Sequence, residues 1–180
     1  MITGTHGSGH KYKILASRIT EFDLVLPNGS LKTLNALTTP NFGHYVFNFG
    51  GLGVITSMTI ALVPKFMVNK SIYENLHWDV LFNKKNYDDI MHRQDFLSLF
   101  TDWKERKMTS VWVGKKFMLN ETAPAYEPEY YGAKHITGPS VHPVPGRDSS
   151  PCATVGNGLW RDKLYHFLPD SPPSSGGDEI

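Results

Sequence analysis

The chain has 180 residues, 40% of them hydrophobic, and a formal net charge of +1. This length suits one ordinary domain or two partial ones. A charge so close to neutral produces no field that would gather nucleic acid or an anionic membrane surface, and no basic run interleaved with aromatic residues occurs. We therefore expect no nucleic-acid partner.

The cysteine content and the apolar runs indicate the cellular compartment of the protein. The single cysteine, Cys152, can form neither an internal disulfide nor a zinc site with a second cysteine, which indicates a structural thiol in a reducing compartment. Residues 1–13 hold no apolar stretch of signal-peptide length, and no window reaches the roughly 20 apolar residues of a membrane span. The sequence predicts a cytoplasmic protein without a membrane span, and leaves peripheral membrane association open.

The first third of the chain is rich in strand signals and in glycine. Residues 22–26 and 31–34 flank Pro27-Asn28-Gly29-Ser30, which predicts a β-hairpin whose central Asn and Gly both take positive φ. Residues 54–63 predict the next strand, which ends at Pro64 because proline cannot donate to a sheet ladder. Regular alternation would place the even-numbered residues of this strand on one face and the odd-numbered residues on the other.

The middle of the chain combines helix and strand signals. Residues 78–82 and 86–94 are short helical candidates, with Asn86 as the N-cap of the second and acidic residues in its first turn. Residues 96–103 and 108–114 predict two strands around a charged turn. These elements indicate the beginning of a new α+β layer.

The last third of the chain differs in composition. Most of the prolines fall after Glu121, and hydrophobic periodicity is lost there. Such a stretch buries little apolar surface by itself, so we expect it to be extended, to lie on a partner domain or to be disordered. Because neither end carries a closing element, we expect the chain to be a middle segment of a longer protein.

Two glycine clusters are the candidate functional motifs. Gly4-Thr5-His6-Gly7-Ser8-Gly9 combines backbone that can approach a flat ligand or a phosphate with hydroxyl and imidazole groups beside it. An ordinary glycine-rich turn explains this hexamer equally well. The second cluster, Gly50-Gly51-Leu52-Gly53-Val54-Ile55-Thr56, leads from a glycine turn into a strand. A glycine bulge that bends a sheet explains such a junction more often than a cofactor contact does.

Other site types fit the first cluster less well. It lacks the Lys-Ser/Thr ending of a P-loop and the spacing of a dinucleotide motif. Ser8 lies between His6 and His10, whereas a serine-hydrolase elbow requires glycines in the G-x-S-x-G pattern. His6 and His10 are four residues apart but lie in a glycine-rich loop, not in a predicted helix. Neither they nor His44 have a carboxylate nearby in sequence, so we expect no metal site.

The two clusters, in this order and at this separation, resemble a known flavin-binding domain. Segments 3–9 (TGTHGSG), 19–29 (ITEFDLVLPNG), 49–56 (FGGLGVIT) and 61–64 (ALVP) are similar to successive landmarks of the FAD-binding domain of vanillyl-alcohol-oxidase-type (PCMH-type) enzymes. Further segments resemble the start of the substrate domain of bacterial alditol (xylitol) oxidases, with aldonolactone oxidases as near relatives. They are residues 76–81, 96–103, 111–112, 138–139, 166–167 and 173–176.

This resemblance implies a fold and an activity. The fold is α+β, with the C-terminal part of a PCMH-type FAD-binding domain over residues 1–65 and the start of an α+β substrate (cap) domain over residues 66–180, including a Pro-rich extended tail from about residue 121. The implied activity is FAD-dependent: hydride passes from a polyol or sugar lactone to flavin, and oxygen becomes hydrogen peroxide. A truncated, inactive remnant that binds no cofactor alone is the alternative.

The resemblance also implies site residues. The first loop would lie along the flavin, Ser8 would contact the substrate as well, and residues 53–55 would back the flavin region. The family's flavin-attaching histidine lies upstream of this loop, and its substrate-activating side chains lie beyond the end of this chain, so no catalytic residue is assigned. The implied flavin-binding residues are Thr3, Gly4, Thr5, His6, Gly7, Ser8, Gly9, Gly53, Val54 and Ile55.

Overall fold

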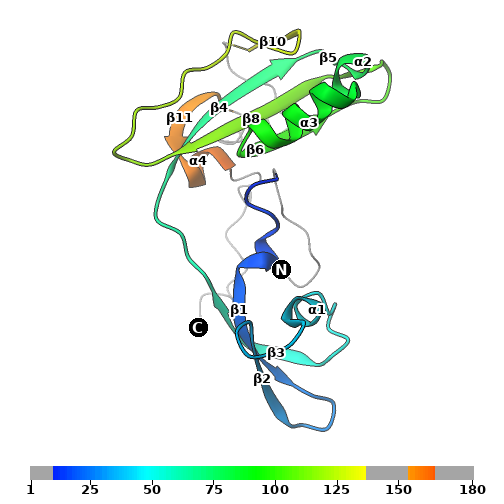
Figure 1. Cartoon of the computed structure of the whole chain (residues 1–180), viewed down its shortest axis with the longest axis vertical. Coiled ribbons are helices and arrows are strands. Elements are labelled where there is room, and N and C mark those ends of the chain that lie inside the picture. Colours follow the sequence, from blue (N-terminus) through cyan, green and yellow to red (C-terminus); the bar gives the residue numbers. More distant parts are fainter. Residues whose placement is uncertain (1–9, 137–153, 165–180) are drawn as a thin grey trace, which may run out of the picture. The chain divides into compact units, whose positions relative to one another are not determined.

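The computed structural model describes residues 10–136 and 154–164, which belong to two compact units, residues 1–64 and 65–180 (Figure 1). Each unit has its own sheet and its own buried core. Several predicted features lie outside the described residues, namely the loop at residues 3–9, Cys152 and the segments at 138–139, 166–167 and 173–176.

The first unit is a three-stranded antiparallel sheet with one short helix. β1 (Ile19–Val25) lies between β2 (Leu31–Asn35) and β3 (Val54–Ile60). The 3-10 turn η1 (Leu15–Arg18) precedes the sheet, and α1 (Phe42–Val46) connects β2 to β3. The core of this unit consists of Ala16, Ile19, Phe22, Leu24, Leu34, Phe42 and Val46.

β1 and β2 form the predicted hairpin, but the turn between them differs from the predicted one. The Gly29 N–H donates to the Leu26 carbonyl at 2.9 Å, and the Leu26 N–H donates to the Ser30 carbonyl at 2.9 Å. Gly29 has a positive φ of 81°, whereas Asn28 does not. The loop is therefore a type I turn followed by a left-handed glycine. Asn28 stabilises it by accepting from the Ser30 N–H at 3.0 Å.

β3 begins where predicted but follows a different pattern. It ends at Ile60, short of the predicted end, because its partner β1 begins at Ile19, directly opposite. A register shift between the two strands leaves Thr56 as a bulge. Ile55 and Met58 therefore both pack against the core. The predicted division of this strand into odd and even faces is wrong for that reason.

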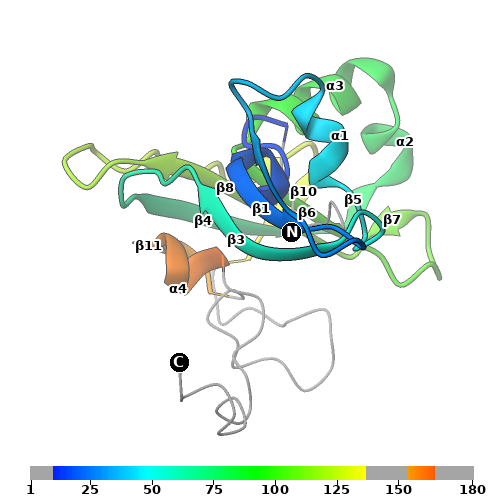
Figure 2. The ribbon, with the colours of Figure 1, turned by 90° about the horizontal axis from the view of Figure 1, so that it is seen from below.

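The second unit is built on a larger antiparallel sheet with helices on its faces (Figures 1 and 2). The strand order is β6-β8-β4-β10-β9, β11 also pairs with β4, and β5 pairs separately with β7. The strands are β4 (Met67–Glu74), β5 (Leu76–His77), β6 (Phe96–Phe100), β7 (Lys107–Met108), β8 (Ser110–Phe117), β9 (Glu129–Tyr130), β10 (Ala133–His135) and β11 (Gly156–Leu159), and the helices are α2 (Trp78–Leu81), α3 (Lys84–Arg93) and α4 (Trp160–Leu164). The described residues thus have an α+β fold with antiparallel sheets.

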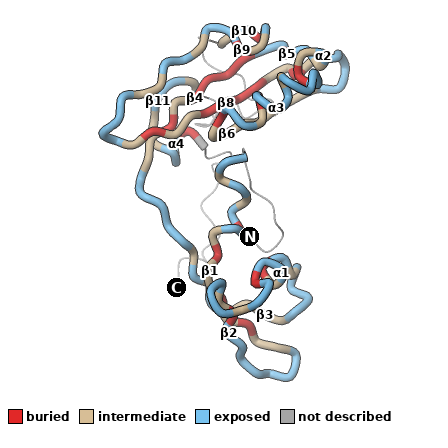
Figure 3. The backbone as a smooth tube through the Cα atoms, viewed as in Figure 1, coloured by how far each residue is buried: buried red, intermediate tan, exposed pale blue. Residues whose placement is uncertain are grey.

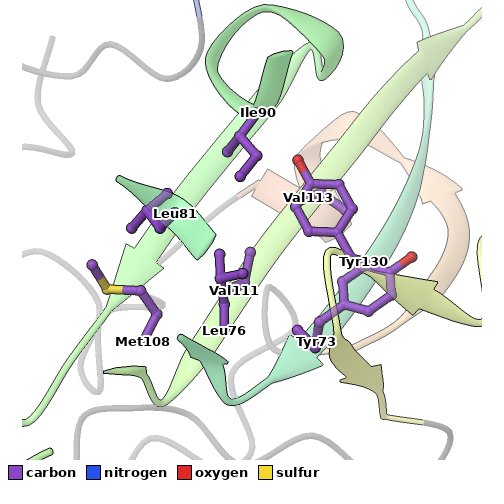
Figure 4. Packing of buried hydrophobic residues seen from close by; sticks show 9 residues of the cluster. Tyr73, Leu76, Leu81, Ile90, Met108, Val111, Val113 and Tyr130 are labelled. Atoms are coloured by element: carbon purple, nitrogen blue, oxygen red, sulfur yellow. The ribbon is translucent and has the colours of Figure 1, made fainter. Parts of the chain in front are cut away.

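The two faces of the larger sheet bury different side chains. On one face, Leu81 of α2 and Ile90 of α3 pack with Val111 of β8 and Leu76 of β5 (Figure 4). On the other face, Ile72 and Trp112 form a smaller cluster. The buried residues of this unit follow β4 and β8 through the middle of the sheet (Figure 3).

The helices and the later strands follow the sequence signals with one correction. Helix α2 and the pair β6 and β8 lie where predicted. Helix α3, however, begins at Lys84 and is capped by Asn83, whose Oδ1 accepts from the Lys85 N–H at 3.2 Å. Asn86 lies within the helix and instead donates to the Val80 carbonyl at 3.0 Å.

The chain after Glu121 is more structured than its composition predicts. Strand β10 pairs with β4, and β11 pairs with β4 further along that strand. Tyr130 and Ala133 are buried in the core of the unit. Residues 129–135 therefore extend the sheet with two short strands, because their apolar side chains fill space beside β4, whereas residues 121–128 contain no helix or strand.

Within residues 10–136 and 154–164, no helix has both the length and the apolar character needed to cross a bilayer.

Candidate functional site

The second glycine cluster forms a tight turn that leads into β3. The Gly51 N–H donates to the Asn48 carbonyl at 2.8 Å. The two residues between them, Phe49 and Gly50, have φ values of 51° and 79°, as in a type I′ turn. The Asn48 side chain holds the turn on both sides, since its Oδ1 accepts from the Gly50 N–H at 2.7 Å and its Nδ2 donates to the Tyr45 carbonyl at 2.8 Å.

Phe49 is held in an unfavourable backbone conformation at the surface. A positive φ is uncommon for a bulky residue because its Cβ approaches the backbone. The side chain of Phe49 is nevertheless 74% exposed, so burial of the ring does not offset this strain. Strained residues of this kind cluster at binding sites, which makes the turn a candidate ligand contact.

Gly53 is required by the sheet itself. Its φ is +147°, and a Cβ atom at this position would lie 2.2 Å from the carbonyl oxygen of Val25. The absence of a side chain allows β1 and β3 to approach each other at the bulged end of their pairing. This close approach explains the glycine without a ligand.

The two residues after Gly53 face different surroundings. Val54 is 67% exposed, whereas Ile55 is half-buried and packs against the core of the first unit. Leu52, which precedes the glycine, is 38% exposed. The structure therefore places one predicted ligand contact, Val54, on the surface and turns Ile55 away from it.

Phe49, Leu52 and Val54 together put apolar groups on a short segment at the start of β3. A flat aromatic ligand needs an apolar surface of this kind, so this segment is a candidate contact for the flavin that the sequence resemblance implies. Neither Phe49 nor Leu52 was assigned to the site from the sequence, because the assignment began at Gly53 and took in only Val54 and Ile55 after it. An aromatic residue directly before a pair of glycines, at the central position of a turn, was the available signal.

The other candidate residues contribute less. Residues 3–9, including Ser8, lie outside the described residues. His10 and His44 are exposed, and the described residues contain no group of three metal-ligating side chains.

One carboxylate on the sheet of the first unit has an altered pKa. Asp23 accepts hydrogen bonds from the hydroxyls of Ser57 and Thr33, each at 2.6 Å, across the two neighbouring strands. The Ser57 hydroxyl, and next the Thr33 hydroxyl, hold the pKa of Asp23 below its ordinary value of 3.8. Asp23 therefore links three strands and remains ionised at neutral pH.

Comparison with known proteins identifies relatives of this chain. No protein-family model matches it. It is 33% identical over 178 residues to an alditol oxidase from a Streptomyces species, a match that covers 98% of this chain and 40% of that protein. The chain is a homologue of part of that oxidase. The resemblance to alditol oxidases seen in the sequence motifs is thereby confirmed.

Two yeast relatives extend the comparison. The D-arabinono-1,4-lactone oxidase of Kluyveromyces lactis is 29% identical over 123 residues, and that of Saccharomyces cerevisiae is 30% identical over 124 residues. Each match covers 68% of this chain and 23% of the relative. The chain thus spans about two fifths of the alditol oxidase, and the lactone oxidases match it over about a quarter of their own length.

Proposed function

We propose that this chain is part of an FAD-dependent oxidase that acts on the CH–OH group of a polyol or a sugar lactone. The observation that carries the proposal is the match to alditol oxidase, which runs through both units and covers 98% of the chain. The homologous lactone oxidases support the second substrate class. Residues 1–65 would be the C-terminal part of a PCMH-type FAD-binding domain, and residues 66–180 the start of the substrate domain.

The residues proposed for the cofactor differ in their roles. The loop from Thr3 to Gly9 would approach the flavin through its backbone, and Ser8 would also bind the substrate. Val54 would contact the ring through its exposed side chain, with Gly53 setting its position and Ile55 supporting the strand from the core side. The apolar segment at the start of β3 would exclude water from that face.

The bound FAD would supply the redox chemistry, namely hydride transfer from the substrate carbon and reoxidation by oxygen to hydrogen peroxide. The chain's own contribution is to bind and orient. The proton of the substrate hydroxyl requires a base, and we assign that role to no residue of this chain.

The test is to purify the protein encoded by the complete reading frame that contains this chain. We expect flavin absorbance in the visible range, and peroxide formation with alditols such as xylitol or with D-arabinono-1,4-lactone. A folded protein that takes up no FAD, or a flavin-loaded protein that oxidises neither class, would contradict the proposal. A folded protein without flavin would support the alternative, an inactive remnant that binds no cofactor.

A further inference from the structure

The chain contains two Asn-Gly sequences, and the structure places them in different environments. Asn28-Gly29 forms the tip of the hairpin between β1 and β2, where both residues are exposed. Asn157-Gly158 lies inside β11, which pairs with β4 through all of its residues. Asparagine is a chemically labile residue, and a following glycine leaves the next backbone nitrogen open to its side-chain amide. The surroundings of each pair therefore decide how readily it reacts.

The side chain of Asn28 is folded back over the glycine that follows it. Its Oδ1 accepts from the Ser30 N–H at 3.0 Å and from the Ser30 hydroxyl at 2.7 Å, and both donors lie beyond Gly29 in the chain. The two donors polarise the side-chain carbonyl, and they point at the oxygen on which negative charge develops when a nucleophile adds to the amide carbon. The hairpin tip therefore carries donors placed to stabilise such an addition.

One interaction opposes attack by the Gly29 nitrogen. Its N–H donates to the Leu26 carbonyl at 2.9 Å, and this hydrogen bond must open first. Opening one neutral hydrogen bond at an exposed turn reduces the reactive fraction by only about twofold to tenfold. Among the described residues, nothing outside the chain neighbours of Gly29 lies within 4 Å of the position that a Cβ would take, so the turn has room to rearrange.

The second pair is held in the sheet. Side chains of an extended strand point alternately to its two faces, so the Asn157 amide is directed away from the next backbone nitrogen. Its Oδ1 accepts from Asn69 Nδ2 at 2.6 Å, across the pairing with β4. The Lys163 side chain lies against Gly158, since a Cβ on that glycine would be 2.6 Å from Lys163 Cε. Reaction at this pair therefore requires β11 to leave β4.

We propose that Asn28 is a site of spontaneous deamidation and that the sheet protects Asn157 from the same reaction. The Gly29 nitrogen loses its proton to solvent and bonds to Asn28 Cγ, the Cγ–Nδ2 bond breaks, and ammonia leaves. Water then opens the five-membered imide at either carbonyl, which gives aspartate or isoaspartate at position 28. Water is the only co-reactant, and no group is oxidised or reduced.

The two products affect the hairpin differently. Aspartate keeps an oxygen that can accept from Ser30 and adds one negative charge to the turn. Isoaspartate carries the main chain through its side-chain carbon, which lengthens the turn and disturbs the hydrogen bonds between Leu26, Gly29 and Ser30. Neither product requires flavin or substrate, so the modification can be measured whatever the outcome for the proposed function.

The experiment is to incubate the folded full chain at mildly alkaline pH and to follow both Asn-Gly peptides by mass spectrometry after digestion. Each rate is divided by the rate of the same pair in urea, which removes the effect of local sequence. We expect aspartate and isoaspartate to accumulate at position 28, and the corrected rate at position 157 to be lower by about tenfold or more. Equal corrected rates, or a faster reaction at Asn157, would overturn the proposal. So would a folded chain in which neither pair reacts in the time that both need in urea.

Two variants test the donors at the hairpin tip. Ser30→Ala removes the hydroxyl donor and keeps the backbone donor, so we expect deamidation of Asn28 in the folded chain to slow by about twofold to tenfold. Ser30→Thr is the matched control, because it keeps a hydroxyl and should react nearly as fast as the parent chain. In urea the three chains should react alike. A folded Ser30→Ala chain that deamidates as fast as the parent, or faster, would contradict activation by the turn.

Discussion

At the scale of single residues, Gly53 is the position where the backbone permits least change. A Cβ atom there would lie 2.2 Å from the Val25 carbonyl oxygen, so we expect Gly53→Ala to separate β1 from β3 and to lower the free energy of unfolding by about 1–3 kcal/mol. Gly43→Ala is the control, because that glycine lies in α1 with no atom near its absent Cβ. Urea denaturation measures the stability of both variants. Equal midpoints would show that the close approach of β1 and β3 at Gly53 does not determine stability.

Asp23 provides a second prediction at this scale, on pH dependence. Hydrogen bonds from Ser57 and Thr33 lower its folded-state pKa below 3.8, so the stability that they confer is present above that pH and is lost as the pH falls through the folded pKa. We expect Ser57→Ala to raise the pKa of Asp23 toward 3.8, and Thr33→Val to raise it less. A carboxyl-detected NMR titration measures this order. Unchanged titration in both variants would contradict the assigned cause.

At the scale of elements, local signals predicted what depends on local chemistry. The turn residues predicted the first hairpin, and apolar runs predicted α2, β6 and β8. We did not predict β4, because polar residues in its middle interrupt the apolar pattern. Lys70 lies 4.0 Å from the centre of the Trp112 ring and donates to the Lys163 carbonyl, and these partners are distant in sequence.

In the candidate site, too, local chemistry predicts some features and long-range pairing decides others. The glycine-to-strand junction could be predicted from residues 50–56, because glycine and β-branched residues have strong local preferences. The sequence could not predict which side chain after Gly53 reaches the surface. That choice depends on the bulge at Thr56, which is set by the register with β1 and is invisible in the sequence of β3. The packing of Ile55 against the core could not be read from residues 50–56 for this reason.

The segment after Glu121 supplies the prediction for this scale. Tyr130 is 1% exposed and packs on Tyr73, with 5.1 Å between ring centroids. We expect Tyr130→Ala to lower the free energy of unfolding by about 3–5 kcal/mol, as for other buried aromatic residues. Tyr126→Ala is the control, because that side chain is 59% exposed. If thermal and urea unfolding show the same small loss for both variants, this segment is only draped on the sheet.

At the scale of the whole molecule, the two units have separate sheets and separate cores. The strand pairs of the first unit all lie within β1 to β3, and those of the second lie within β4 to β11. Each sheet also has a core of its own side chains. Substitutions at the proposed cofactor surface of the first unit should therefore leave the core of the second unit unchanged. The alditol oxidase match runs through both units.

The last prediction uses this independence in the complete, flavin-loaded protein. Val54→Asp places a carboxylate where the proposed flavin ring would lie, and an ionised group desolvated against an aromatic surface is unfavourable, so we expect flavin affinity to fall by about tenfold or more. Thr56→Asp adds the same charge at the exposed bulge of the same strand and should leave flavin content unchanged. The ratio of flavin to protein absorbance measures both. Because both side chains are exposed, unfolding without flavin should differ little between the variants, so a loss of flavin in Val54→Asp alone reports contact with the cofactor. Equal flavin content in the two variants would contradict flavin binding at the start of β3.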